Sequence, residues 1–213
     1  VVLLVLLLVA VYFLLRLLPE AQKSDALDPA AVDQLKRRAL AEGLRAHGDD
    51  AEALKRQWKT VGSRDREDPQ VAAAAAAAFS RLGESRLAHE IIEASLAREW
   101  SPHLLSLYAE SPDGDAARQI QRAEGWLKEH PDDAVLLLAL GRLCAHAGLW
   151  GKAQSYMEAS LSVEPTYSAY LALAELDERL ERPEAARDAY RKSLDLALAQ
   201  LRSATGGRRK TVL

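Results

Sequence analysis

The stretch AEGWLKEHPDDAVLLLALGRLCAHAGLWGKAQSYMEASLSVEPT, residues 123–166, decides the fold of this protein. Its motif MEASL, at 157–161, has an earlier copy, IEASL, at 92–96, and a related copy, YRKSL, at 190–194. The copies begin 65 and 33 residues apart, close to two units and one unit of the same length. A period in this range is typical of helical repeats, in which each unit is a pair of antiparallel helices.

The flanking residues keep the same register. Small residues stand where the two helices of a unit approach, bulky residues fill the space between units, and Gly or Pro marks helix ends. We assign repeat packing to Leu140, Gly141, Gly148, Ala153, Met157 and Pro165, then to Ala174, Ala186 and Tyr190, and earlier to Gly83, Ala88 and Ile92. The pattern is regular in the second, fourth and fifth units and weak in the first and third.

Ten helices are predicted after residue 28, in five hairpins over about 29–60, 69–98, 101–130, 132–163 and 167–200. A single hairpin cannot bury its apolar side, so neighbours stack into a superhelix. The predicted class is all-α, a right-handed α-solenoid over 29–200. The seven alanines at 72–78 favour helix and unusually close packing. A disordered basic tail is expected over 201–213, which contains two adjacent glycines and three consecutive cations.

The first 18 residues are an apolar stretch whose one charge is Arg16. Eighteen helical residues span roughly 27 Å, close to the thickness of a bilayer's hydrocarbon core. Two interpretations stay open for residues 1–18: a membrane-spanning helix, or a helix buried within the array. Residues 19–28 follow as a linker. If the stretch spans, the cations after it place the repeat domain in the cytoplasm.

Composition excludes several classes of protein. The chain has 213 residues and a formal net charge of −3, which argues against a dedicated nucleic-acid binder. Its one cysteine, Cys144, excludes an intramolecular disulfide framework and a cysteine-rich zinc module. We predict no metal site and no catalytic residue.

The spacing of Leu140, Gly141, Gly148, Ala153 and Pro165 resembles the tetratricopeptide repeat (TPR). More narrowly, the stretch 123–166 is similar to the HemY family of bacterial inner-membrane TPR proteins, as are LLRLLPEAQKSDALD at 14–28 and EALKRQWKTV at 52–61. The resemblance implies a non-enzymatic scaffold of the inner membrane, attached through its N-terminal region, whose repeat domain faces the cytoplasm. It also implies enzymes of late haem biosynthesis as protein partners. That family has two N-terminal membrane helices, and this chain has at most one apolar span.

The family label is shared with a flavin-dependent protoporphyrinogen oxidase. That enzyme requires a G-x-G-x-x-G fingerprint between a strand and a helix to bind its dinucleotide. The chain contains no such motif, so the oxidase interpretation is excluded.

Residues that could carry chemistry are sparse. Cys144 and His146 lie two positions apart on a predicted helix and point in different directions, so they cannot share a ligand. Cys144 is expected to be a buried thiol. The candidates for an axial haem ligand are His89, His103 and His146. Trp100 and Trp150, near predicted turns, are candidates for exposed contact with a partner.

Three hypotheses follow. The first is a scaffold without a cofactor, whose groove holds a partner protein. The second is a carrier or chaperone that holds haem or a porphyrin in the groove with a histidine ligand. The third is an enzyme, which requires convergent titratable groups that the repeat pattern does not bring together.

Overall fold

The computed structural model describes residues 28–46, 50–111 and 114–208. Within these ranges the regular structure consists of eleven helices and no strands. The helices are α2 (Pro29–Arg45), α3 (Ala51–Thr60), α4 (Ser63–Arg66), α5 (Pro69–Arg81), α6 (Ser85–Leu96), α7 (Pro102–Glu110), α8 (Ala116–Leu127), α9 (Ala134–His146), α10 (Trp150–Val163), α11 (Tyr167–Arg179) and α12 (Pro183–Arg208).

The predicted all-α hairpin array is confirmed. The five hairpins are α2/α3, α5/α6, α7/α8, α9/α10 and α11/α12. The short helix α4 lies between the first two hairpins, in a segment without a predicted helix. Asp50 starts α3 by accepting a hydrogen bond from the Ala53 amide at 2.8 Å, and Asp133 accepts from two amides of α9, each at 2.9 Å. Gly83 and Gly148 form turns with φ of 79° and 72°, a region that favours glycine.

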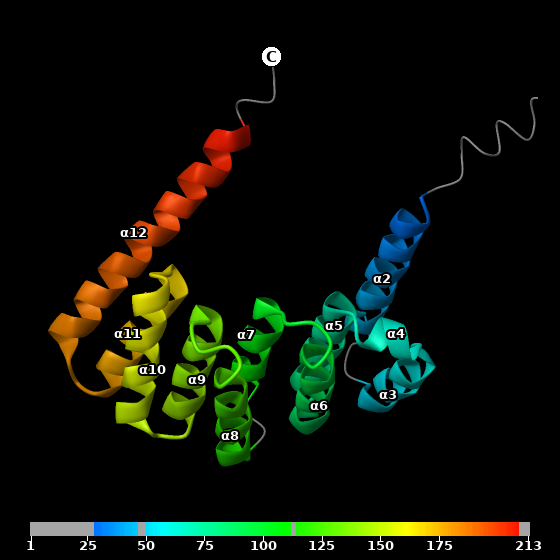
Figure 1. Ribbon diagram of the computed structural model, residues 1–213, viewed down its shortest axis with the longest axis horizontal. Helices are drawn as coiled ribbons and strands as arrows, with labels where there is room; N and C mark the ends of the chain where they lie inside the picture. The colour runs from blue at the N-terminus through cyan, green and yellow to red at the C-terminus, as the bar shows by residue number, and fades with distance from the viewer. Residues whose placement is uncertain (1–27, 47–49, 112–113, 209–213) are drawn as a thin grey trace, which may run out of the picture.

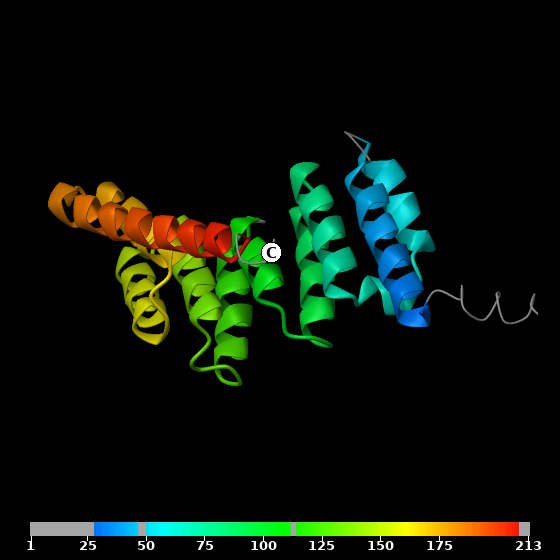
Figure 2. The same cartoon turned by 90° about the horizontal axis from the view of Figure 1, so that it is seen from above.

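The first helices of the hairpins form one continuous layer. Helix α2 packs on α5, α5 on α7, α7 on α9, and α9 on α11. The second helices α3, α6, α8 and α10 each touch the first helix of the following hairpin. The row therefore runs from α2 at one end to α11 and α12 at the other (Figure 1), and the view from above keeps this order (Figure 2).

Packing within a hairpin is closest where the sequence pattern is most regular. The pairs α5/α6, α9/α10 and α11/α12 approach closely, whereas α2/α3 and α7/α8 touch far less. Gly141 shows the constraint: a Cβ atom there would lie 2.7 Å from Cγ of Met157 and 3.3 Å from the carbonyl oxygen of Ala153. Since interiors are packed to crystal-like density, only the smallest residue fits at this crossing.

The residues assigned to repeat packing divide into two groups. Those within helices are buried, except for half-buried Tyr190, and those in turns are exposed. The buried set is Ala88, Ile92, Leu140, Gly141, Ala153, Met157, Ala174 and Ala186, and the exposed set is Gly83, Gly148 and Pro165.

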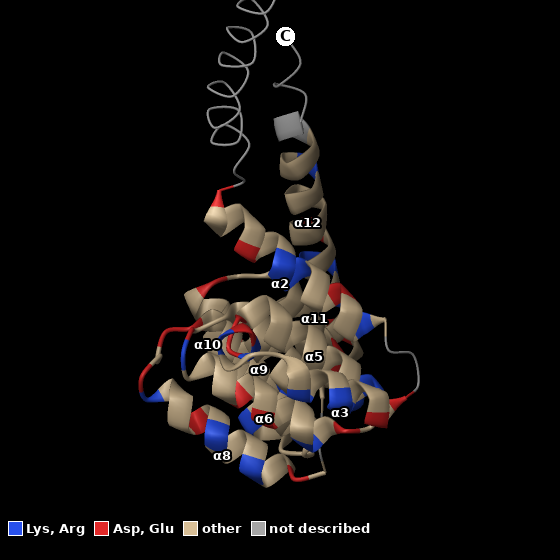
Figure 3. Cartoon of the chain, turned by 90° about the vertical axis from the view of Figure 1, so that its right-hand side faces the viewer, with Lys and Arg blue, Asp and Glu red and all other residues tan. Residues whose placement is uncertain are grey.

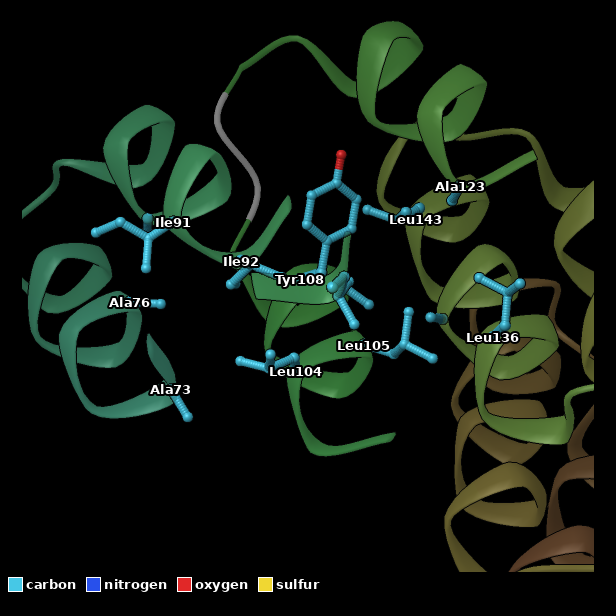
Figure 4. Packing of buried hydrophobic residues seen from close by; sticks show 14 of the residues in the cluster. Ala73, Ala76, Ile91, Ile92, Leu104, Leu105, Tyr108, Ala123, Leu136 and Leu143 are labelled. Carbon is cyan, nitrogen blue, oxygen red and sulfur yellow. The ribbon is translucent and has the colours of Figure 1, made fainter. Parts of the chain in front are cut away.

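The core also runs between hairpins. Leu104, Leu105 and Tyr108 of α7 are fully buried between the second hairpin and the helices that follow (Figure 4). The Tyr108 ring meets Trp126 edge-on with centroids 5.1 Å apart. A buried leucine contributes about 1.5–3 kcal/mol relative to an exposed one. Helix α7 is thus held mainly by its neighbours on either side, because its contact with its own partner α8 is slight.

The ends of the chain differ from the prediction in one respect. Helix α12 continues to Arg208, so residues 201–208 are helical and the expectation of disorder there is wrong. The preceding sequence, SLDLALAQLRS at 193–203, is rich in strong helix formers, which outweigh the two glycines. The possible membrane span at 1–18, most of the linker at 19–28, and residues 209–213 lie outside the described residues. No helix of the described part is long and apolar enough to cross a membrane.

The Gly141 crossing yields a stability prediction. Gly141→Ala should reduce the free energy of unfolding by about 1–3 kcal/mol, because the new methyl group overpacks the α9/α10 contact. The measurement is urea denaturation followed by circular dichroism. The matched control is Gly125→Ala on α8, where a new Cβ meets nothing within 4 Å. The control should gain up to about 1 kcal/mol from helix propensity. Equal effects of the two substitutions would contradict the packing argument.

Candidate partner-binding groove

Three consecutive first helices enclose a hollow of about 440 Å³, which we call the inner groove. It lies between α2, α5 and α7, on the continuous layer of first helices. Its lining consists of Arg38, Ala41, Glu42 and Arg45 from α2, Gln70 and Ala73 from α5, and His103 from α7. Residues far apart in the sequence meet here because α2 and α7 pack against opposite sides of α5.

The floor of the inner groove is made of small apolar side chains. Ala41 and Ala73 are both buried. Ala73 belongs to the seven-alanine run, of which six members are buried and only Ala77 is exposed. Methyl groups fill little space, so a bound segment can come close to the α5 backbone. The alanine run, which was predicted to allow close helix packing, thus also contributes Ala73 to the surface of the inner groove.

The walls of the inner groove are polar and carry more positive than negative charge. Nη1 of Arg45 pairs with Oε1 of Glu42 at 2.6 Å. Arg38 is exposed and makes no ion pair within the ranges that the structure describes. Two guanidinium groups therefore face one carboxylate, which leaves an uncompensated positive charge beside the apolar floor. Elsewhere both signs of charge are interspersed over the array (Figure 3).

The three candidate histidines do not come together. His89 is only 1% exposed, and its Nε2 lies 3.0 Å from Nε2 of Gln119 in a buried polar network. His103 is exposed and lines the inner groove. His146 lies at the exposed end of α9, where partial burial of its ring lowers the pKa of the imidazole, and the charge of Arg179 lowers it further. Only His103 therefore lies where a groove ligand could reach it.

The two candidate tryptophans also differ. Trp100 turns inward: its Nε1 donates to Oδ2 of Asp133 at 2.7 Å, and its ring stacks on His130 with centroids 3.8 Å apart. Trp100 is half-buried, so its contact with a partner stays a prediction. The sequence signal that could have revealed the Trp100 hydrogen bond is the carboxylate of Asp133 at the start of α9. Trp150, 36% exposed at the start of α10, stays a candidate.

A second polar cluster joins α8 to α10 and lies outside the inner groove. Oη of Tyr156 donates to Oε1 of Glu124 at 2.9 Å, and Lys152 pairs with the same carboxylate. The Lys152 hydrogen bond lowers the pKa of Glu124, and burial raises the pKa of Tyr156 to about 12. Burial also raises the pKa of the Cys144 thiol, so it is neutral and unreactive at neutral pH. The contacts of Glu124 with Lys152 and Tyr156 hold α8 against α10.

Comparison with known proteins supports the fold. No protein-family model matches the chain, and no curated protein matches it by sequence. The structure titled MamA 41-end from Desulfovibrio magneticus RS-1 is similar, with a TM-score of 0.51 at 18% identity over 78% of this chain and 96% of that chain. A crystal structure of MamA gives a TM-score of 0.48 at 16% identity over 70% of this chain and 90% of that chain.

The class of protein follows from these observations. MamA is a TPR-like all-helical protein, and this chain shares its helical repeat fold. At 18% identity the likeness shows the fold alone. A TPR-type repeat is therefore supported, while membership of the HemY family in particular is not supported by these comparisons.

The inner groove offers little apolar surface to a porphyrin. Flat macrocycles are held by apolar side chains against both faces. Among the described residues that line the groove, Ala41 and Ala73 are apolar and the others are charged or polar. No group of three potential metal ligands occurs in the described part of the chain.

We therefore expect haem titration to leave the Soret band at the position of free haem. Absorbance spectroscopy of the whole protein and of His103→Ala checks this directly, since His103 is the one histidine among the described residues that line the groove. A Soret shift in the unmodified protein that His103→Ala abolishes would contradict the expectation and restore the carrier hypothesis.

Proposed function

We propose that this protein is an adaptor that holds an acidic segment of a partner protein in the inner groove. The observation that carries the proposal is the juxtaposition of Arg38, free of any ion pair in the described ranges, with the groove floor formed by Ala41 of α2 and Ala73 of α5. A carboxylate on the partner would meet Arg38, and small apolar side chains beside it would pack on the floor. Arg is well suited to this role because its planar fork binds carboxylates in a bidentate manner.

A binding role agrees with the layout of the chain better than a catalytic one. Helical repeats use an extended surface along the first helices, and the inner groove spans three of them. The thiol of Cys144 is buried and the histidine candidates lie apart, so these residues do not form a nucleophile–base pair. TPR-like scaffolds suggest protein partners in general.

The identity of the partner and the location of the protein are proposed from sequence resemblance and not from the groove. A link to enzymes of late haem biosynthesis, and attachment to the bacterial inner membrane with the repeats in the cytoplasm, rest on the resemblance of 14–28, 52–61 and 123–166 to the HemY family. The apolar composition of residues 1–18 also supports attachment.

The groove proposal is tested by affinity capture from detergent-solubilised membranes with the full chain as bait. Arg38→Glu and Gln70→Trp should each reduce recovery of the specific partner by about tenfold or more, because one reverses the groove's free charge and the other fills the hollow. Higher salt should weaken the same complex, since its charges sit near solvent. Quantitative mass spectrometry of the eluates measures both effects.

The matched control is Arg86→Glu, a charge reversal on the exposed face of the second helix α6. It should leave recovery unchanged. Equal losses with Arg38→Glu and Arg86→Glu would contradict a groove-specific contact. Recovery of a partner without any haem-pathway enzyme would leave the groove proposal standing and remove the haem link.

A further inference from the structure

The last position of the EASL-type motif is buried or partly buried in two hairpins and exposed in the last hairpin. Leu96, Leu161 and Leu194 end the three EASL-type motifs and are therefore equivalent. Leu96 is 5% exposed and Leu161 packs partly buried against the core, but Leu194 is 59% exposed. The first two precede a further hairpin, whose first helix packs on α6 or α10. In the described chain nothing occupies the corresponding place beside α12.

The bare position belongs to a longer stripe on α12. Leu194, Leu198 and Leu201 are all exposed, and their spacing of four and three residues puts them on one face of the helix. The side that packs on α11 is different: it carries Ala186, Ala189 and Ser193. We call the three leucines the tail stripe. Figure 3 shows the projecting part of α12 to be largely without charge.

The opposite end of the row has a matching stripe. Val32, Leu35 and Ala39 of α2 are exposed and lie at i, i+3 and i+7. They point away from Ala41 and Leu44, the buried residues through which α2 joins the core. We call Val32, Leu35 and Ala39 the head stripe. Figure 1 places α2 and α12 at opposite ends of the row, so the two stripes of one molecule do not cover each other.

We propose that the tail stripe of one molecule docks on the head stripe of a second copy of this chain. The repeat itself identifies the occupant: α6 and α10, which carry Leu96 and Leu161, are each followed by a hairpin whose first helix packs on them, and α2 is a first helix without a preceding hairpin in the described array. The contact extends the stacking of the solenoid from one molecule to the next. It is heterologous, head to tail, and so produces rings or open-ended chains of molecules.

Site-directed crosslinking tests this contact on the full chain in intact cells. Cys144 is first changed by Cys144→Ser, so that the introduced cysteines are the only ones. Two differently tagged copies are then co-expressed, one with Leu35→Cys and one with Leu198→Cys, and treated with a short membrane-permeant bismaleimide. A dimer that carries both tags is the expected product, and Leu194→Glu in the second copy should abolish it.

The matched control is Ala199→Cys, also exposed on α12 but about 100° around the helix from Leu198. It should give no dimer with Leu35→Cys. Equal dimer from this control, a dimer from two Leu198→Cys copies, or no dimer at all would overturn the proposal. The second outcome would indicate a symmetric contact between tail stripes, and the third a different cover for α12.

A charge exchange keeps the test independent of folding defects. Leu35→Lys in both copies, and Leu198→Glu in both copies, should each lose association, as measured by co-purification of the two tags. When both copies carry both substitutions, association should return, because opposite charges then meet across every head-to-tail contact. Circular dichroism of each variant checks the helical content, and failure of the pair to restore association while both variants fold would overturn the proposal.

Discussion

The close crossing of α9 and α10 at Gly141 is the constraint on which the structure depends. The backbone of one helix and the Met157 side chain of the other leave no room for even a methyl group. This crossing sets the distance between the helices of the hairpin, and equivalent alanines set it in α5/α6 and α11/α12. Once hairpins have a fixed width, bulky residues such as Tyr108 can lock one hairpin to the next, and the array propagates along the chain.

The groove and the ends follow from this arrangement. An array of hairpins presents its first helices as one layer, and the alanines that allow α5 to pack closely also lower the floor of the inner groove. At each end of the described array, the side that a further hairpin would cover is exposed. The exposed leucines of α12 and the exposed Val32 and Leu35 of α2 are those sides.

The sequence predicted the parts governed by periodicity. The five hairpins and the turns at Gly83 and Gly148 agree with the structure. Contacts that depend on a particular partner side chain were not predictable in this way. Trp100 points inward because Asp133 and His130 contact it. The inner groove exists because residues of α2, α5 and α7, far apart in the sequence, lie together. The helical end of α12 was missed because two glycines outweighed the leucines and alanines before them in our interpretation.

A double-mutant cycle between Gly141 and Met157 tests the central constraint most directly. The free energies of unfolding are measured for the unmodified protein, Gly141→Ala, Met157→Ala and the double variant. If the helices meet as described, Met157→Ala makes room for the new methyl group, and the double variant is more stable than the sum of the single losses by about 1 kcal/mol or more. Strictly additive losses would mean that α9 and α10 do not meet at this point, and the account of the array would fail with them.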